Sequence, residues 1–98
     1  MDGVAPPLKL IWAVRKSLES GESAKQGVQR YLKSEKDNWQ ELVLRWLSLL
    51  QQGRNTEEML KAQLSPLRQQ LLQTIEQGMR GEAILPLIIQ LEDEAYYQ

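Results

Sequence analysis

Apolar side chains recur along this chain at spacings of three and four residues, which is the period of an α-helix. The first such stretch spans about 7–20 and begins at two prolines, which are tolerated in the first turn of a helix. A second helix is predicted from Ser23, a good N-cap residue, and a third from Asp37, with Gln40 in the capping-box position. The third helix has the longest amphipathic stripe, formed by Trp39, Leu42, Val43, Trp46, Leu49 and Leu50.

The second half of the chain predicts three further helices. Asn55 and Thr56 are candidate N-caps of a short fourth helix. Ser65 followed by Pro66 is a typical helix start, with serine at the cap and proline at the first helical position. A sixth helix is expected over about 82–96. No segment alternates apolar and polar residues over a sustained length, so no β-sheet is predicted.

The predicted helix ends share one pattern, an apolar residue followed by polar residues and a glycine. The pattern occurs at Leu18-Glu19-Ser20-Gly21, Leu50-Gln51-Gln52-Gly53 and Ile75-Glu76-Gln77-Gly78. Glycine suits the left-handed residue that follows many helices, and another helix start comes soon after each of these glycines. The chain therefore divides into three αα-hairpins.

Three hairpins of this length can either stack as a solenoid or close into a bundle. At 98 residues we expect the closed form, an all-α compact six-helix bundle. It would form a single helical domain over residues 1–98, with short flexible termini at about 1–6 and 95–98.

Composition narrows the possible chemistry. The chain has no cysteine and no histidine, which excludes disulfides, thiol nucleophiles, the usual zinc ligand sets and Ser-His or Cys-His catalysis. It has no phosphate-binding or dinucleotide-binding glycine motif. The net charge of -1 lacks the positive excess typical of nucleic-acid binders. We therefore expect no enzyme activity, no cofactor, no metal and no nucleic-acid partner.

Membrane insertion by this chain is not expected. The longest apolar stretch, 84–89, has six residues, whereas a spanning helix needs about 20. The N-terminus lacks the basic start and apolar run of a signal peptide. The expected location is cytoplasmic, at the inner face of the membrane if the chain belongs to a longer protein.

The three-hairpin pattern carries a family resemblance. A glycine-broken helix is followed by a short amphipathic helix in 18–32 and again in 49–64. The third hairpin combines a close glycine pair, Gly78 and Gly81, with a leucine-rich helix that ends in acidic residues. This arrangement resembles the cytoplasmic domain of type II secretion system protein F, a family that includes the platform proteins of type IV and tight-adherence pili.

That resemblance implies a six-helix bundle that docks assembly partners, such as a secretion or pilus ATPase or another platform component, through helix surfaces. The chain departs from the family in one motif, because the third hairpin usually contains Gly-Glu-x-x-Gly and here the glycines are three residues apart. The alternative is a stand-alone helical adaptor or regulator that forms a homodimer or binds a partner helix.

Two sets of apolar residues are candidate partner contacts. Tryptophan is enriched at binding hot spots, so Trp12 is a candidate, although core packing is the simpler interpretation for it and for Trp46. Apolar residues occupy every side of the sixth helix. This helix is therefore either central to the bundle or packed on a second chain, which makes Leu87 and Ile88 candidate interface residues.

Charge is unevenly distributed along the sequence. Residues 1–36 carry seven basic and four acidic side chains, a net charge of +3, and residues 37–98 carry five basic and nine acidic, a net charge of -4. Lys25, Arg30 and Lys33 are candidate contacts for an acidic partner, the simpler alternative being a solvated helix face. The acidic residues 92–94 are interpreted as a solvated tail, because their spacing is not that of a calcium loop.

Overall fold

A computed structural model describes residues 6–34 and 38–96, and all regular structure within these ranges is helical. The six helices are α1 (Pro6–Glu19), α2 (Ala24–Ser34), α3 (Asn38–Gln51), α4 (Glu57–Gln63), α5 (Pro66–Met79) and α6 (Leu85–Tyr96). The predicted all-α class and the number of helices are confirmed. Asp37, the predicted cap of the third helix, lies outside the described residues.

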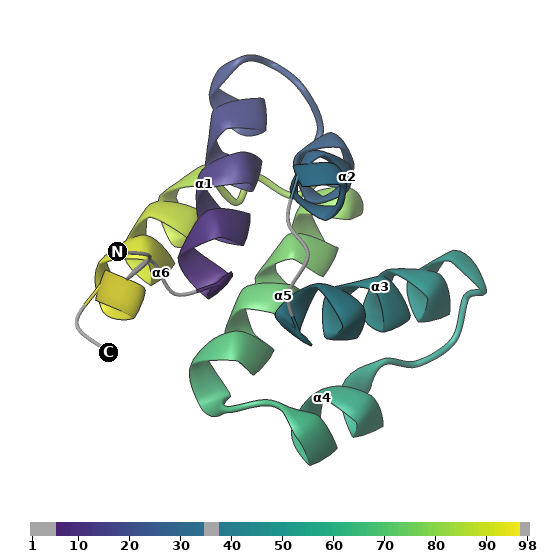
Figure 1. Ribbon diagram of the computed structural model, residues 1–98. Coiled ribbons are helices and arrows are strands. Elements are labelled where there is room, and N and C mark those ends of the chain that lie inside the picture. The colour runs from purple at the N-terminus through teal and green to yellow at the C-terminus, as the bar shows by residue number, and fades with distance from the viewer. Residues whose placement is uncertain (1–5, 35–37, 97–98) are drawn as a thin grey trace.

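The helices pack around α1 and α5 (Figure 1). Helix α1 packs most extensively against α2 and α6, and α5 contacts α2, α4 and α6. The first and third hairpins therefore pack helix on helix, whereas α4 packs more closely on α5 than on its hairpin partner α3. The Cα radius of gyration is 12.4 Å, close to the value of about 13 Å typical of a folded 100-residue domain. The chain is thus a closed bundle and not an extended solenoid.

Bulky side chains join α3 to the rest of the bundle. Trp39 and Trp46 are 2% and 0% exposed and belong to a core cluster that receives residues from all six helices. The guanidinium of Arg68 on α5 lies 5.0 Å from the centroid of a Trp39 ring, within the range of a cation–π contact. Core packing of Trp46 is confirmed.

The hairpin turns share one hydrogen-bond pattern. The N–H groups of Glu22, Arg54 and Glu82 donate to carbonyls five residues earlier, at 2.8, 2.9 and 3.1 Å. Together with a second bond from the preceding glycine, this is the Schellman motif, which requires a left-handed residue after the helix. The left-handed residues are Gly21, Gly53 and Gly81, with φ of 80°, 71° and 94°.

The prediction that Gly78 ends the fifth helix is therefore wrong. Gly78 lies inside α5, and the helix continues to Met79. A Cβ at Gly78 would overlap the side chain of Ile84 and lie 3.3 Å from the Cβ of Ala24. Glycine at this position permits close packing of α5 against the chain entering α6, while Gly81 makes the turn.

Gly27 permits a second close contact, between α2 and α1. A Cβ there would lie 2.6 Å from Cα of Val14 and 3.0 Å from the carbonyl oxygen of Ala13. Both are backbone atoms, which cannot move aside as a flexible side chain can. The low helix propensity of glycine is therefore offset by the close approach of the two helices.

The starts of α2, α4 and α5 agree with the sequence in position, but their caps differ in hydrogen bonding. Ser23 forms a reciprocal cap with Gln26, because its Oγ accepts the Gln26 N–H at 3.2 Å and its own N–H donates to Gln26 Oε1 at 2.8 Å. Thr56 and Ser65 occupy N-cap positions without a side-chain cap bond. Gln40 donates its side-chain amide to the carbonyl of Leu32 at 3.0 Å.

The last helix differs from the prediction at its start but not at its end. Helix α6 begins at Leu85, three residues later than predicted, and runs to Tyr96. Ala95, at the start of the tail that the sequence predicts to be flexible, is helical, 7% exposed and part of the core. Residues 1–5 and 97–98 lie outside the described ranges.

The close contact at Gly27 predicts a destabilising Gly27→Ala substitution. We expect the free energy of unfolding to fall by about 1–3 kcal/mol, the usual cost of overpacking, although alanine has the better helix propensity by roughly 1 kcal/mol. Urea denaturation measures this, with the exposed α2 residue Gln29→Ala as the matched control. Equal or higher stability of Gly27→Ala would contradict the tight α1–α2 contact.

Candidate interaction surfaces

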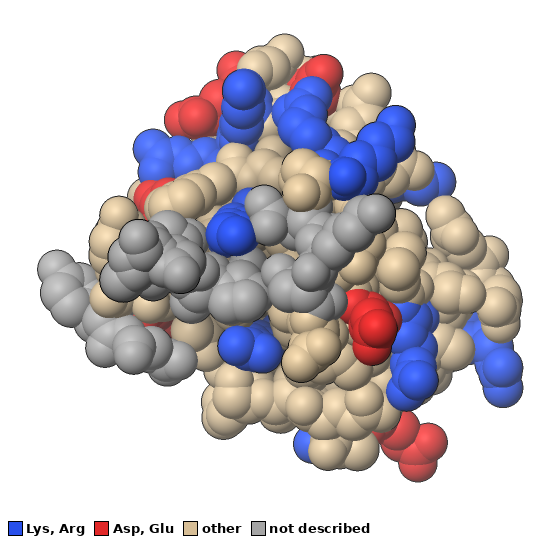
Figure 2. All heavy atoms as spheres, in the orientation of Figure 1, with Lys and Arg blue, Asp and Glu red and all other residues tan. Residues whose placement is uncertain are grey.

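The three candidate basic residues of α2 line two different hollows. Figure 2 shows lysine and arginine side chains around the top of the molecule with acidic side chains between them. Lys33 and Arg30 line a shallow hollow of about 310 Å³ together with Glu22, Gln26 and Gln29. Lys25 lines a different cleft, on the side of α3 and α5.

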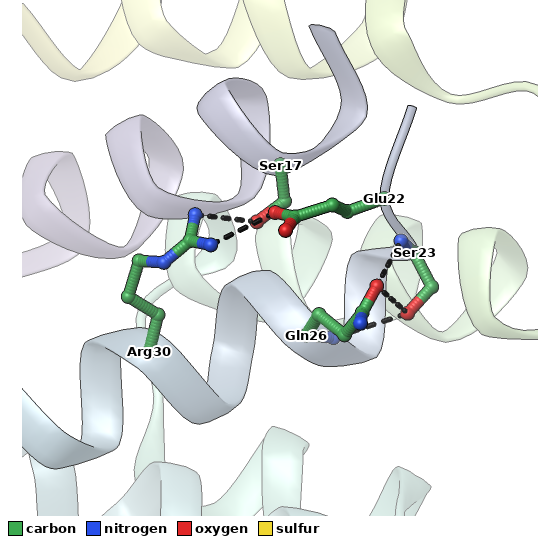
Figure 3. Close-up of polar contacts among 5 residues, drawn as sticks. All are labelled: Ser17, Glu22, Ser23, Gln26 and Arg30. Atoms are coloured by element: carbon green, nitrogen blue, oxygen red, sulfur yellow. Dashed lines mark hydrogen bonds and ion pairs between the residues drawn. The ribbon is translucent and has the colours of Figure 1, made fainter. Parts of the chain in front are cut away.

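Arg30 is held within the chain (Figure 3). Its Nη1 donates to Ser17 Oγ at 3.0 Å and its Nη2 donates to Glu22 Oε1 at 2.8 Å. Ser17 is fully buried on α1, and Glu22 belongs to the turn between α1 and α2. The hydrogen bond from Arg30 is the main reason why the pKa of Glu22 lies below its ordinary value. Arg30 therefore links the helices of the first hairpin, which limits its use by a partner.

The candidate apolar residues divide between surface and core. Trp12 on α1 is 38% exposed and Leu87 on α6 is 42% exposed. Ile88 is 0% exposed and lies in the core, so it cannot contact a partner in the folded chain and is corrected to a core residue. Two exposed apolar side chains, Leu44 and Tyr96, were not among the candidates.

An ion pair connects the two helices that carry Trp12 and Leu87. Arg15 Nη1 of α1 lies 2.5 Å from Glu92 Oε1 of α6, and the Glu92 side chain is only 15% exposed. Glu92 is thus part of the α1–α6 contact, whereas Asp93 and Glu94 are exposed. The interpretation of 92–94 as a solvated tail is therefore wrong for Glu92.

Glu76 connects three parts of the chain. Its Oε1 accepts hydrogen bonds from Trp46 Nε1 at 2.7 Å and from Thr56 Oγ1 at 2.5 Å. Its Oε2 lies 3.7 Å from Arg80 Nη2. The Glu76 side chain is 12% exposed, so this carboxylate joins α3, the α3–α4 loop and α5 at a largely buried position.

A cleft opens beside Glu76, and the sequence did not indicate it. It has a volume of about 410 Å³, and its lining residues are Lys25, Leu47, Leu50, Gln51, Gly53, Arg54, Glu76, Met79 and Arg80. A second hollow of about 350 Å³ shares five of these residues and extends to Asn55 and Thr56. The two together form one groove, called here the α3–α5 groove, lined by apolar and basic side chains.

The link between Arg30 and Glu22 predicts a pH-dependent effect of Glu22→Gln. A carboxyl whose pKa is lowered by folding adds stability above its ordinary value of 4.5, and this stability is lost as the pH falls through the lowered value. We expect wild type to be more stable than Glu22→Gln at neutral pH, with a difference that disappears in acid. Urea denaturation between pH 7 and pH 3 tests this at roughly the range where carboxyl groups titrate.

The exposed Glu82→Gln serves as the control for this pH series. A constant difference between wild type and Glu22→Gln across the series would mean that the Glu22 charge does not stabilise the first hairpin.

The acceptor role of Glu76 predicts that Glu76→Ala is strongly destabilising. The substitution leaves the buried indole N–H of Trp46 without its acceptor, and we expect the free energy of unfolding to fall by about 2–3 kcal/mol. Glu76→Gln keeps an acceptor oxygen and should lose less. Thermal unfolding followed by tryptophan fluorescence measures both variants, and equal losses would show that charge and not hydrogen bonding is what matters.

Comparisons with protein-family models, curated proteins and solved structures found no match to this chain. Within residues 6–34 and 38–96, no helix is long and apolar enough to cross a membrane. In the same ranges, no group of three or more carboxylates is placed to hold a metal ion. The functional proposal therefore depends on the helical fold and on the surfaces described above.

Proposed function

We propose that this chain is a non-catalytic protein–protein interaction module that acts like the cytoplasmic domain of secretion and pilus platform proteins. It docks an assembly ATPase or another platform component on the cytoplasmic side of the membrane. The support is the all-α bundle of six helices and the resemblance of its three glycine-broken hairpins to that family. The module transmits position and movement through helix surfaces and performs no chemistry of its own.

The observation that carries the proposal is the exposure of two large apolar side chains on adjoining helices. Trp12 and Leu87 keep 38% and 42% of their surface in solvent although α1 and α6 pack extensively against each other. Covering such side chains with a partner removes apolar surface from water, which favours binding by about 25 cal/mol for each Å². Tryptophan is also among the residues that contribute most to binding energy.

The exposure of Leu87 also supports the alternative function, a stand-alone adaptor that forms a homodimer. Neighbouring Ile88 is buried within the chain, so Leu87 is the residue of this pair that a second copy could cover. A dimer through α6 would place the same surface of both copies in contact, as two-fold symmetry requires.

The proposal predicts which proteins the tagged chain recovers from a lysate of the source organism. We expect an assembly ATPase or platform component, identified by mass spectrometry after washing at moderate salt. The double variant Trp12→Ala, Leu87→Ser should lose this partner, because two apolar anchors are removed. Leu44→Ser, which removes an exposed leucine of α3, is the matched control and should retain it.

Two other results would overturn the platform proposal. Recovery of unrelated soluble regulators without any assembly protein would contradict it. Recovery of the chain alone, with a dimeric mass at micromolar concentration that Leu87→Asp converts to a monomeric mass, would establish the homodimer instead.

A further inference from the structure

The α3–α5 groove concentrates positive charge in a chain whose net charge is negative. Its lining includes Lys25, Arg54 and Arg80 and a single acidic residue, Glu76. Lys25 and Arg54 have no ion-pair partner among the described residues, and the Arg80 side chain is 70% exposed. Glu76 already accepts two hydrogen bonds, from Trp46 and Thr56. The groove therefore presents more cationic groups than the chain itself neutralises.

Helix dipoles neutralise only part of the positive charge of the groove. Arg54 and Arg80 follow the C-terminal ends of α3 and α5, where a cation is favoured by the partial negative charge of about half an elementary charge at each end. These two partial charges together offset about one cation. The three cations and one carboxylate of the lining leave a net charge of +2, so positive charge remains after the dipoles are counted.

Lys25 is placed where helix stability does not favour it. It is the second residue of α2, whose first turn contains no acidic side chain. A cation beside the positive end of a helix dipole is unfavourable for the helix. Lys25 therefore weakens its own helix slightly while adding charge to the groove.

The groove also has an apolar part. Leu47 is 7% exposed, and Leu50 and Met79 are partly buried against the core. Methionine adapts its shape to different apolar partners because its side chain is unbranched and flexible. The lining continues past Arg80 to Asn55 and Thr56, so the groove is longer than one small ion requires.

We propose that the α3–α5 groove binds an acidic segment of a partner protein, with a bulky apolar side chain of that segment seated on Leu47, Leu50 and Met79. Carboxylates on either side of the apolar residue pair with Lys25, Arg54 and Arg80. The charge of the groove selects an acidic partner, and its apolar lining selects a peptide over a simple anion. This deepens the proposed function, since it adds a second docking surface and states the chemistry of its ligand.

The test uses a blocked peptide, Asp-Glu-Leu-Leu-Asp-Glu, titrated into the ¹⁵N-labelled chain and followed by amide chemical shifts. We expect saturable shifts at Gly53, Arg54, Met79 and Arg80, which border the groove, and weaker binding as salt is raised. The comparison ligands are the same peptide with serine in place of leucine, a version with lysine in place of the acids, and inorganic phosphate. None of the three should bind with comparable affinity.

Charge reversal provides the second arm. Lys25→Glu combined with Arg54→Glu should weaken peptide binding by at least about tenfold, the equivalent of 1.4 kcal/mol, because two ion pairs become repulsive. Lys25→Glu alone should not lower the midpoint of thermal unfolding, since an acid at a helix start is favourable. Arg45→Glu, an exposed position on α3 outside the groove lining, is the matched control and should bind normally.

Three outcomes would overturn the proposal. One is the absence of saturable shifts at the groove up to millimolar peptide. Another is equal binding of phosphate or of the serine peptide, which would make the groove an anion site only. The third is unchanged affinity of the charge-reversed variant. If the groove does not bind the peptide but assembly partners are still recovered through Trp12 and Leu87, the proposed function stands without this inference. If the groove binds the peptide but no assembly partner is recovered, the platform role is overturned and the groove remains a peptide-binding site.

Discussion

The contact of α2 with the backbone of α1 at Gly27 is the constraint on which the rest of the bundle depends. A Cβ at Gly27 would lie 2.6 Å from Val14 Cα, so the two helices are closer here than side chains normally permit. Ser17, one turn after Val14, is buried at the same crossing and accepts a hydrogen bond from Arg30. With α1 and α2 fixed, α6 packs on α1, and α5 packs on both α2 and α6.

The partly buried polar groups are used to join separate segments. Glu76 receives donors from α3 and from the α3–α4 loop, and Arg15 of α1 pairs with Glu92 of α6. A buried acceptor that loses its donor costs more than an exposed one, because no water replaces the bond. These links therefore select one arrangement of helices whose apolar faces alone would permit several.

The sequence predicted local features well and long-range ones poorly. Helix periodicity and turn glycines are local, so six helices and the glycines at 21 and 53 were found correctly. The four-residue pattern that marks the other two helix ends points to Gly78, whereas the left-handed residue is Gly81. Only the packing of Ile84 against Gly78, a contact between α5 and the chain that enters α6, distinguishes the two glycines. Leu87 and Ile88 are adjacent on a helix that is apolar all round, and contact with the other helices decides which one is buried.

The α3–α5 groove is not evident from the sequence, because it depends on contacts between distant helices. The distribution of charge along the sequence is also misleading. Along the sequence, positive charge is concentrated in residues 1–36, which indicated a basic surface on the second helix alone. In three dimensions Arg30 is turned toward Ser17 and Glu22, while Lys25 joins Arg54 and Arg80 from the acidic part of the chain. Both arginines lie next to turn glycines, so the turns that end α3 and α5 also supply the charge of the groove. The Schellman turns at Gly53 and Gly81 therefore have two roles. They reverse the chain, and they place Arg54 and Arg80, from distant segments, on the same surface.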